Sequence, residues 1–221
     1  MQKPIYETLM SLPLFQGLCS NELTLMLEKM KLHFHKVRPK GIIVHQGEEC
    51  NKLILLLCGS INSETTDKEQ TFSLTEKINS PAIIEPYSLF GLQPQYTATY
   101  RAETEVSLLY INKVYLLTEM MKYTSFQINY LNLLSARSQC YNQKIWEYKN
   151  LNITQKIYNF VYLRCAIPQG EKKLSIRMED LGTLIGETRV NVSKELNDLC
   201  QKGLVKLTRK NILIPDLEKL K

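Results

Sequence analysis

Polar and apolar positions in residues 1–33 have the spacing of short helices. Leu23, Met26 and Met30 recur at steps of three and four residues, which places them on one face of a helix. Ser20 stands just before this pattern, and serine is a common N-cap, so we expect it to cap the helix. The N-terminal segment is therefore predicted to be helical.

The hydrophobic period changes at Phe34. From there, short runs of leucine and β-branched residues alternate with glycines and other turn residues. Many short strands at even spacing are typical of a small antiparallel barrel or roll. The glycines are Gly41, Gly47 and Gly59, and the later apolar runs lie at 71–74, 82–84 and 106–111.

Helical patterning returns after Asn112 and dominates up to residue 164. Within it, one set of positions follows steps of three and four residues over nearly three heptads, which is the spacing of a coiled-coil seam. The sequence therefore predicts a long helix that pairs with a second copy in a homodimer. The alternative is that this helix packs on the chain's own roll. The seam residues are Leu131, Leu134, Ser138, Tyr141, Ile145 and Tyr148.

A break in this pattern marks a domain boundary. Asn150 and Asn152 interrupt the helical period, and a new helix then places Ile157, Phe160 and Val161 on one face. We expect the C-terminal domain to begin there.

Two further apolar stripes follow within MEDLGTLIGETRVNVSKELNDLC. Each has the period of a helix, so two short helices are predicted to pack against each other. The first stripe consists of Leu181, Leu184 and Ile185, and the second of Val192, Leu196, Leu199 and Cys200.

Three residues in and after the first stripe suit a tight turn between the two helices. Gly186 permits the backbone geometry of a helix-to-helix connection, Gly182 allows the two helices to approach closely, and Thr188 is placed to cap the second helix. This combination predicts a helix-turn-helix.

The second helix has an outward face suited to DNA. Because a helix turns about 100° per residue, an inward Val192 places Val190, Lys194, Asn197 and Asp198 on the opposite side, with Arg189 in the first turn. Arginine can bind guanine through two hydrogen bonds, and valine can contact the methyl group of thymine.

A predicted hairpin follows, with strands at 204–207 and 211–214. Its basic tip would contact the DNA backbone beside the recognition helix. The candidate DNA-binding residues are Thr188, Arg189, Val190, Asn191, Lys194, Arg209 and Lys210.

The charge distribution agrees with this prediction. The chain has 28 Lys and Arg residues and 22 Asp and Glu residues, a net charge of +6. From Asn152 onward there are 13 basic and 8 acidic residues, so this last third carries +5. Such asymmetry favours a phosphate-binding module, although a solvated basic face has the same composition.

Other classes of function find little support in the sequence. The six cysteines are scattered without zinc-finger spacing, so we expect reduced, mostly buried thiols and no metal site. Motifs of hydrolases, P-loop enzymes and zinc proteases are missing, and no catalytic residue is predicted. No apolar run is long enough to span a membrane, and the N-terminus lacks a signal-peptide core, so we expect a cytoplasmic protein.

Three stretches together resemble a known family: LFQGLCSNEL, KGIIVHQGEECNKLILLLCGSI and LGTLIGETRVNVSKELNDLCQKGLV. They are similar to transcription regulators of the Crp/Fnr type, the family of the cyclic-AMP receptor protein. The resemblance implies an α+β fold: an N-terminal cyclic-nucleotide-binding-like β-roll (a double-stranded antiparallel jelly roll), a long dimerisation helix and a C-terminal winged helix-turn-helix. The expected parts are a sensor domain at 1–112, the dimerisation helix and hinge at 113–151, and the DNA-binding domain at 152–221.

The chain departs from the family in two places. Glu195 stands where the family has an apolar residue facing the first helix. In members that bind cyclic AMP, an Arg-Ser pair holds the phosphate, and here Tyr96 and Thr97 occupy those positions. Without that arginine a buried phosphodiester would lack compensation for its desolvation, so we do not expect cyclic AMP to be the ligand. Arg101 could replace it only if the backbone were rearranged.

The effector of the sensor domain stays unknown. A redox signal or a small molecule, for example haem or an apolar metabolite, is the alternative that the sequence leaves open, although His33, His35 and His45 all precede the usual haem pocket. The candidate ligand-pocket residues are Tyr87, Phe90, Tyr96, Thr97 and Arg101.

The family also implies its partners. We expect a homodimer on double-stranded DNA with an inverted-repeat operator, and RNA polymerase as a further partner. The loop IPQGEKK at 167–173 is a candidate polymerase contact, on the expectation that it is exposed.

Overall fold

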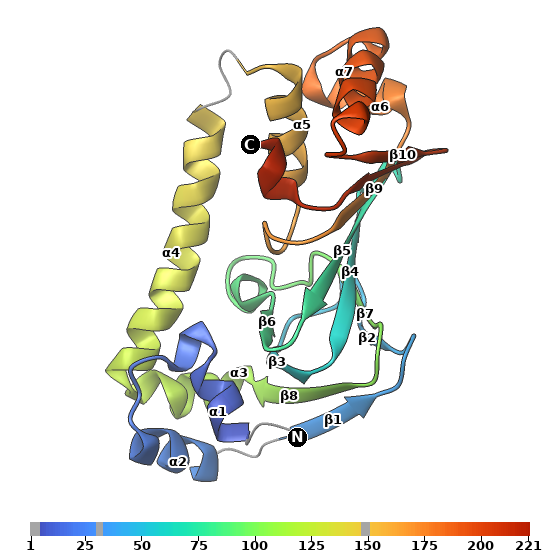
Figure 1. Cartoon of the computed structure of the whole chain (residues 1–221). Helices are drawn as coiled ribbons and strands as arrows, with labels where there is room; N and C mark the ends of the chain where they lie inside the picture. The colour runs from blue at the N-terminus through green and yellow to red at the C-terminus, as the bar shows by residue number, and fades with distance from the viewer. Residues whose placement is uncertain (1–4, 30–32, 147–150) are drawn as a thin grey trace. The chain divides into compact units, whose positions relative to one another are not determined.

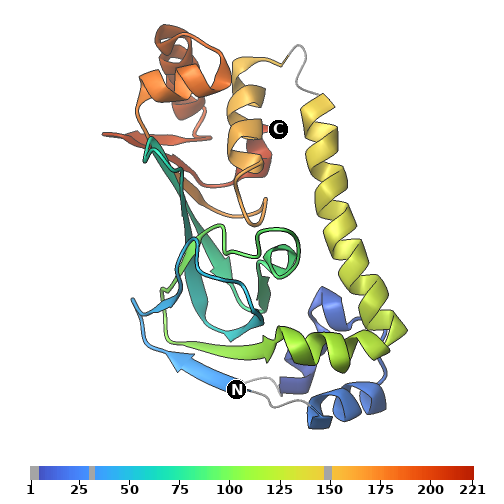
Figure 2. The same cartoon turned by 180° about the vertical axis from the view of Figure 1, so that it is seen from behind.

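The computed structural model describes residues 5–29, 33–146 and 151–221 of the chain (Figures 1 and 2). It divides into two compact units, one formed by residues 1–61 and 78–140 and the other by residues 62–77 and 141–221. The segment 62–77 therefore groups with the C-terminal part of the chain. The strands that precede and follow it in the sequence belong to the first unit.

The first unit contains the predicted antiparallel roll. One of its sheets has the strand order β1-β8-β3-β6, and a second pairing joins β2 to β7. The strands are β1 (His33–Val37), β2 (Ile42–Val44), β3 (Lys52–Cys58), β6 (Ala82–Ile84), β7 (Thr99–Ala102) and β8 (Val106–Asn112).

Strand β3 forms the centre of the roll's core. It pairs with β8 on one side and with β6 on the other, and four consecutive residues, 53–56, are buried. Burial of successive residues means that both faces of the strand are covered. The run KLILLLC therefore reads as a core strand because its leucines have no solvent-facing side.

Short helices precede the roll, as α1 (Ile5–Met10), η1 (Pro13–Phe15) and α2 (Ser20–Lys29), and follow it, as α3 (Lys113–Thr118) and η3 (Met120–Lys122). A further one, η2 (Pro86–Ser88), lies within the roll between β6 and β7. The prediction that Ser20 caps α2 is wrong, because Ser20 is already helical. Cys19 takes this role: its N–H donates to Glu22 Oε2 at 2.8 Å, and the Glu22 N–H donates to Cys19 Sγ at 3.4 Å. This reciprocal pair has the form of a capping box, with sulfur as the acceptor.

The long helix α4 (Thr124–Trp146) follows (Figure 1). One face of its first turns is buried against the roll and the N-terminal helices. The ring centroids of Phe126 and Phe15 are 5.9 Å apart, and Tyr130 Oη donates to the carbonyl of Pro86 at 2.5 Å. Further along, Leu131 is 61% exposed and Ile145 is 65% exposed.

The other predicted seam positions have mixed exposure. Leu134 and Tyr141 are half-buried, and Ser138 is exposed. Tyr148 lies outside the described residues. The long helix of the prediction is confirmed, and whether it pairs with a second copy is a separate question.

The second unit is a winged helix-turn-helix joined by a hairpin from the middle of the chain. It contains α5 (Ile153–Tyr162), α6 (Met178–Ile185), α7 (Arg189–Gln201), η4 (Leu217–Leu220) and the strands β9 (Lys172–Ile176), β10 (Lys206–Thr208) and β11 (Asn211–Ile214). Asn152 caps α5 in a capping box with Gln155, which fixes the helix start where the sequence predicts it. Figure 2 shows α5 beside the C-terminal η4.

The hairpin of β4 (Ser60–Thr66) and β5 (Phe72–Asn79) contributes to the core of this unit. Strand β5 pairs antiparallel with β9, with Leu74 opposite Leu174. Phe72 and Leu74 are buried in the same cluster as Leu181 of α6. The apolar run 71–74, predicted as a strand of the roll, therefore completes the hydrophobic core of the winged helix-turn-helix.

A buried ion pair lies at the same strand pair. Glu76 Oε2 is 3.3 Å from Lys172 Nζ, and both side chains are almost fully buried. Glu76 also accepts hydrogen bonds from the N–H groups of Ala166 and Ile167. The expectation that the whole loop 167–173 is exposed is wrong, because Lys172 begins β9 and points into the unit.

The expectation of mostly buried thiols is also wrong. Cys50 and Cys165 are buried, whereas Cys19, Cys58 and Cys200 are exposed and Cys140 is half-buried. Cys19 lies next to α2, Cys200 lies in α7 and Cys58 ends β3, and all three face solvent. An apolar residue type does not by itself require burial.

Candidate nucleic-acid interface

Helices α6 and α7 are joined by the predicted tight turn. Gly186 ends α6 in the left-handed conformation at φ 68° and ψ 41°, which glycine adopts without steric cost. The Glu187 N–H donates to the Gly182 carbonyl at 2.8 Å. A Cβ at Gly182 would lie 2.8 Å from the Glu187 carbonyl oxygen, so only glycine allows the turn to approach α6 this closely.

Thr188 caps α7 as predicted, since its side chain accepts from the Asn191 N–H at 3.2 Å. The buried face of α7 contains Val192, Leu196 and Leu199. The prediction that Leu184 and Cys200 belong to the buried stripes is wrong, because Leu184 is 42% exposed and Cys200 is exposed. Both stand at the edge of their stripe, where the partner helix no longer covers the side chain.

Polar contacts from α5 fix the helix-turn-helix. Lys156 Nζ lies 2.5 Å from Glu187 Oε1 in the turn, and this hydrogen bond lowers the pKa of Glu187. The Thr154 hydroxyl donates to the carboxylate of Glu195. Glu195, for which the resemblance implies an apolar residue in the family, is therefore held by a hydroxyl of the neighbouring helix.

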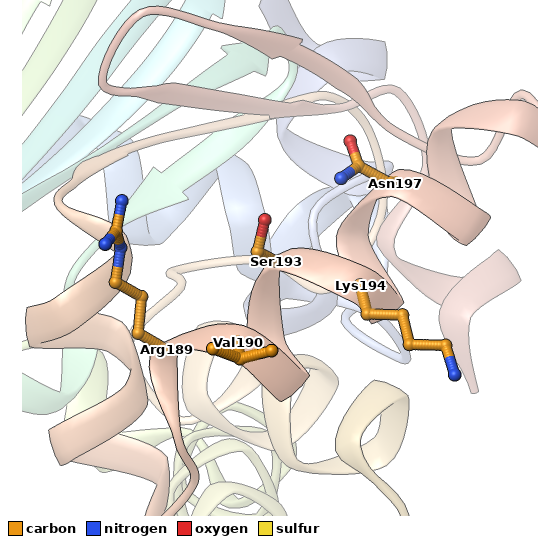
Figure 3. A pocket seen from close by; sticks show the side chains of 5 residues that line it. All are labelled: Arg189, Val190, Ser193, Lys194 and Asn197. Carbon is orange, nitrogen blue, oxygen red and sulfur yellow. The ribbon is translucent and has the colours of Figure 1, made fainter.

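The outward face of α7 is shallow and polar. Arg189, Val190, Ser193, Lys194 and Asn197 surround a concavity of about 350 Å³ (Figure 3). Val190 is 75% exposed although it is apolar. The structure therefore brings together Arg189, Val190 and Lys194, as the sequence predicts, and adds Ser193, which lies three residues after Val190 on the same face.

Arg189 also borders a second concavity, of about 270 Å³, between α6, α7 and the hairpin tip. Its lining includes Arg177, Glu179 and Lys210. The Arg189 guanidinium lies 3.7 Å from the Glu179 carboxylate, and both side chains are about two thirds exposed. An ion pair this exposed contributes little to stability, so Glu179 orients Arg189 without holding it firmly.

The predicted wing is confirmed with a small shift of its first strand. Strand β10 pairs with β11 from Lys206 to Thr208, and Arg209 and Lys210 form the two-residue tip. Lys210 has φ 68°, and its carbonyl accepts from the Ile176 N–H at 3.0 Å, which ties the tip to β9. Both basic side chains at the tip are exposed.

Positive charge therefore surrounds the exposed N-terminal turn of α7. Arg177 precedes α6, Arg189 and Lys194 lie on α7, and Lys210 lies on the wing. Arg177 is the basic residue that the sequence analysis missed. The signal that could have found it is its place directly before α6, because the first turn of that helix lies beside the first turn of α7.

Both parts of the chain match known domain families. Residues 34–123 match the cyclic nucleotide-binding domain, and residues 155–221 match the Crp-like helix-turn-helix domain. The chain belongs to the Crp/Fnr family of transcription regulators.

Relatives of this Crp/Fnr protein extend over most of its length. The cAMP-activated global transcriptional regulator CRP of Salmonella typhimurium is 22% identical over 189 residues, which cover 82% of this chain and 89% of the relative. Vfr of Pseudomonas aeruginosa, also described as a cAMP-activated global transcriptional regulator, is 22% identical over 200 residues, covering 85% and 92%. Both relatives are described as transcriptional regulators.

Solved structures show the same fold. The catabolite activator protein of Thermus thermophilus superposes with a TM-score of 0.54 at 21% identity, covering 95% of this chain and 96% of that one. The c-di-GMP responsive regulator CLP of Xanthomonas campestris superposes with a TM-score of 0.51 at 16% identity, covering 89% and 99%. The α+β fold with an N-terminal roll, a long helix and a C-terminal winged helix-turn-helix is confirmed.

In this Crp/Fnr chain, each of the five residues predicted to line a ligand pocket contacts another part of the first unit. The guanidinium of Arg137 lies 3.6 Å from the ring centroid of Tyr87. The Phe90 ring meets Tyr130 edge to face, and Tyr96 Oη donates to the Lys52 carbonyl. Thr97 donates to Glu85, and Arg101 donates to the Lys40 carbonyl at 2.9 Å.

These contacts place the five residues in different surroundings. Tyr96 is 1% exposed and its pKa is raised by burial, so it is a core residue. Arg101 is exposed, and its guanidinium donates to the Lys40 carbonyl in the loop before β2. Tyr87 and Phe90 both lie against α4.

The described ranges contain no group of three or more His, Cys, Asp or Glu side chains that could hold a metal ion. Over the same ranges, no helix has the length and the hydropathy needed to cross a membrane. His35 stacks on Tyr110 with ring centroids 4.4 Å apart, so it is part of the surface of the roll.

Proposed function

We propose that the protein is a dimeric, sequence-specific DNA-binding transcription regulator that recognises an inverted-repeat operator. The observation that carries this proposal is the exposed face of α7, where Arg189, Val190 and Lys194 stand beside the basic wing. In this assignment Arg189 binds a guanine edge, and Val190 contacts the methyl group of a thymine in the major groove.

The wing and the cap have different roles in this assignment. Arg209 and Lys210 at the tip contact phosphates, so they set the orientation of the domain and carry no base preference. Thr188 and Asn191 stand in the first turn of α7, where exposed backbone and side-chain N–H groups can donate to a phosphate. Lys194, one turn further on, reaches the next base edge or its phosphate.

Dimerisation through α4 is supported by its exposed apolar positions. Leu131 and Ile145 are both more than half exposed and lie two heptads apart, and Ile128 is 51% exposed one turn earlier. A soluble helix seldom presents such residues at heptad spacing unless a partner covers them. A two-fold dimer would place two recognition helices about 34 to 36 Å apart.

The effector that controls the protein has more than one candidate. We infer that cyclic AMP is not the ligand, because Tyr96 replaces the arginine of the family and its hydroxyl is engaged in the core. A sensor for an apolar or redox-active molecule is favoured by one observation: Tyr87 and Phe90 contact α4 through Arg137 and Tyr130. A ligand beside these rings would act directly on the dimerisation helix.

Two further elements belong to this proposal. The exposed part of the loop 167–173, Gln169 to Glu171, is our candidate contact for RNA polymerase. We also infer that the protein acts in the cytoplasm, where a bacterial operator is accessible.

Selection of bound sequences from random duplex DNA tests the function. We expect enrichment of an inverted repeat whose half-sites are one helical turn apart. Recovery of random sequences with no motif would contradict sequence-specific binding. Mass analysis of the natively purified protein for a bound small molecule or metal would then separate a ligand-controlled regulator from a constitutive one.

A further inference from the structure

Glu85 is a buried carboxylate in the first unit. It is 3% exposed and lies between β6 and η2, directly before Pro86. Its backbone has φ 38° and ψ 54°, the left-handed conformation that residues other than glycine seldom adopt. The proline that follows makes this conformation more unusual, because a residue before proline prefers extended backbone.

Five neutral donors surround the carboxylate. Oε2 accepts from the Thr97 N–H at 2.8 Å and from the Ser88 hydroxyl at 2.6 Å. Oε1 accepts from the Thr97 hydroxyl at 2.9 Å, from the Ala98 N–H at 3.1 Å and from the Tyr100 hydroxyl at 3.0 Å. We call this set of donors the oxyanion cradle.

The cradle explains how the strained backbone is maintained. A left-handed residue with a Cβ is sterically unfavourable, and such an outlier persists only where the surroundings impose it. Here the hydrogen bonds to a negatively charged acceptor are of the strong, charge-assisted kind. The donors and the carboxylate therefore fix each other.

We propose that the cradle is an oxyanion-binding site that the chain fills with its own Glu85. Donors from two consecutive backbone N–H groups and from hydroxyls of η2, the 97–98 segment and β7 would suit a carboxylate, a phosphate or a phosphodiester. The cradle lies within the segment that matches the cyclic nucleotide-binding domain. A diffusible anion cannot bind to these donors unless Glu85 leaves them.

Removal of the side chain should convert the cradle into a site for a free anion. Glu85→Gly keeps the left-handed backbone at no steric cost and leaves the donors without an acceptor. In phosphate-free buffer we expect its unfolding temperature to fall by roughly 5 °C or more. Inorganic phosphate or acetate should then raise it, by roughly 3 °C at ten times the dissociation constant.

Two matched variants separate a filled cradle from general effects of salt. Glu85→Gln keeps the cradle filled but turns an amide NH₂ toward donors, so it should be destabilised and should not respond to anions. Glu103→Ala removes an exposed carboxylate that accepts from the Ser60 hydroxyl outside the cradle, so it should not respond to anions as Glu85→Gly does. Sodium chloride at equal ionic strength is the reference for every measurement.

Any of three results would overturn the proposal. The first is that Glu85→Gly has the unfolding temperature of the native protein. The second and third are that phosphate or acetate raises the unfolding temperature of Glu85→Gln, or of the native protein, as much as it raises that of Glu85→Gly. If Glu85→Gly does not fold in phosphate-free buffer, refolding is compared in phosphate and in chloride. A folded yield that depends on phosphate supports the proposal, and equal failure in both contradicts it.

Different anions distinguish the sources of the ligand. Acetate, phosphate and cyclic AMP offer a carboxylate, a free phosphate and a phosphodiester to the same donors. The anion that raises the unfolding temperature of Glu85→Gly most identifies the anion size that the cradle prefers. These measurements use stability alone. Failure of DNA binding would therefore leave the inference intact, and failure of anion rescue would leave the proposed function intact.

Discussion

Lys172 Nζ lies 3.3 Å from Glu76 Oε2, and the two side chains are 0% and 2% exposed. The lysine also donates to the Gln169 carbonyl at 2.7 Å. Burial raises the pKa of Glu76, which shows that the carboxylate's loss of hydration is only partly offset by its partners. The pair therefore specifies the register of β5 against β9 more than it adds to stability.

Loss of one member of this pair should be costly. Lys172→Met leaves Glu76 without its counter-ion, and we expect the free energy of unfolding to fall by about 3 to 5 kcal/mol. The double variant Lys172→Met with Glu76→Gln should recover part of this loss, because a glutamine oxygen can still accept from the Ala166 N–H. Lys173→Met, at an exposed neighbouring position, serves as control. Urea unfolding measures all four proteins, and equal stability of single and double variants would contradict the charge explanation.

The turn of the helix-turn-helix should be sensitive to acid. The hydrogen bond from Lys156 lowers the pKa of Glu187, so the ionised form is favoured in the folded state. The resulting stabilisation is present above the ordinary pKa of a glutamate and is lost as pH falls through the lowered value. Glu187→Gln should therefore be less stable than the native protein at neutral pH and equally stable well below pH 4. Denaturant unfolding at both pH values checks this. A gap that does not close in acid would mean that the charge of Glu187 is not its source.

The dimer can be tested on α4. Leu131→Asp with Leu134→Asp should give monomers, because charges in a helical seam oppose association. Asn132→Asp with Ser135→Asp has the same spacing and added charge on exposed positions of the helix, and it should stay dimeric. Analytical ultracentrifugation distinguishes the two forms. A native protein that is already monomeric at micromolar concentration would refute the proposed interface.

Arg189 and the wing should affect DNA binding in different ways. Arg189→Ala should cost about 1 to 3 kcal/mol per half-site and relax the preference for one guanine. Arg209→Ala or Lys210→Ala should weaken binding to all sequences alike and flatten its salt dependence. Titration of the selected operator and of single-base variants at fixed salt compares them. If Arg189→Ala weakened specific and nonspecific DNA equally, the residue would be only a phosphate contact.

Cyclic AMP should not bind at physiological concentrations. The resemblance to the family implies that Tyr96 stands at the position of the phosphate-binding arginine, and the adjacent Thr97 N–H already donates to Glu85. Calorimetric titration of the native protein with cyclic AMP should give no binding heat. Micromolar affinity would mean that Arg101 or another cation has replaced the arginine.

The local geometry of the DNA-binding motif could be predicted from the sequence. Gly186, Gly182 and Thr188 act through backbone conformation and contacts a few residues away, so their types identify a turn and a cap. The same reasoning failed at Ser20, because the preceding Cys19 supplies an acceptor that is rarer at such positions. It also failed at Cys200, since a helical stripe does not indicate where the covering helix ends.

Long-range pairing is what the sequence did not reveal. Nothing in TFSLTEKIN distinguishes a strand of the roll from a strand that pairs with β9, since both need alternating apolar residues. Lys172 reads as a surface residue until Glu76 is placed opposite it. Glu85 likewise has no local signature, because its donors come from residues 12 to 15 positions later as well as from Ser88.

The pairing of β5 with β9 has a consequence for folding during synthesis, because the two strands are far apart in the sequence. Glu76 accepts from an amide that lies 90 residues further along the chain. At a synthesis rate of about 5 to 20 residues per second, that partner emerges roughly 5 to 20 s after the hairpin. Until β9 has been synthesised, β5 is an unpaired edge strand that exposes Phe72 and Leu74. The hairpin of one nascent chain can therefore pair with β9 of a more complete chain on the same messenger RNA.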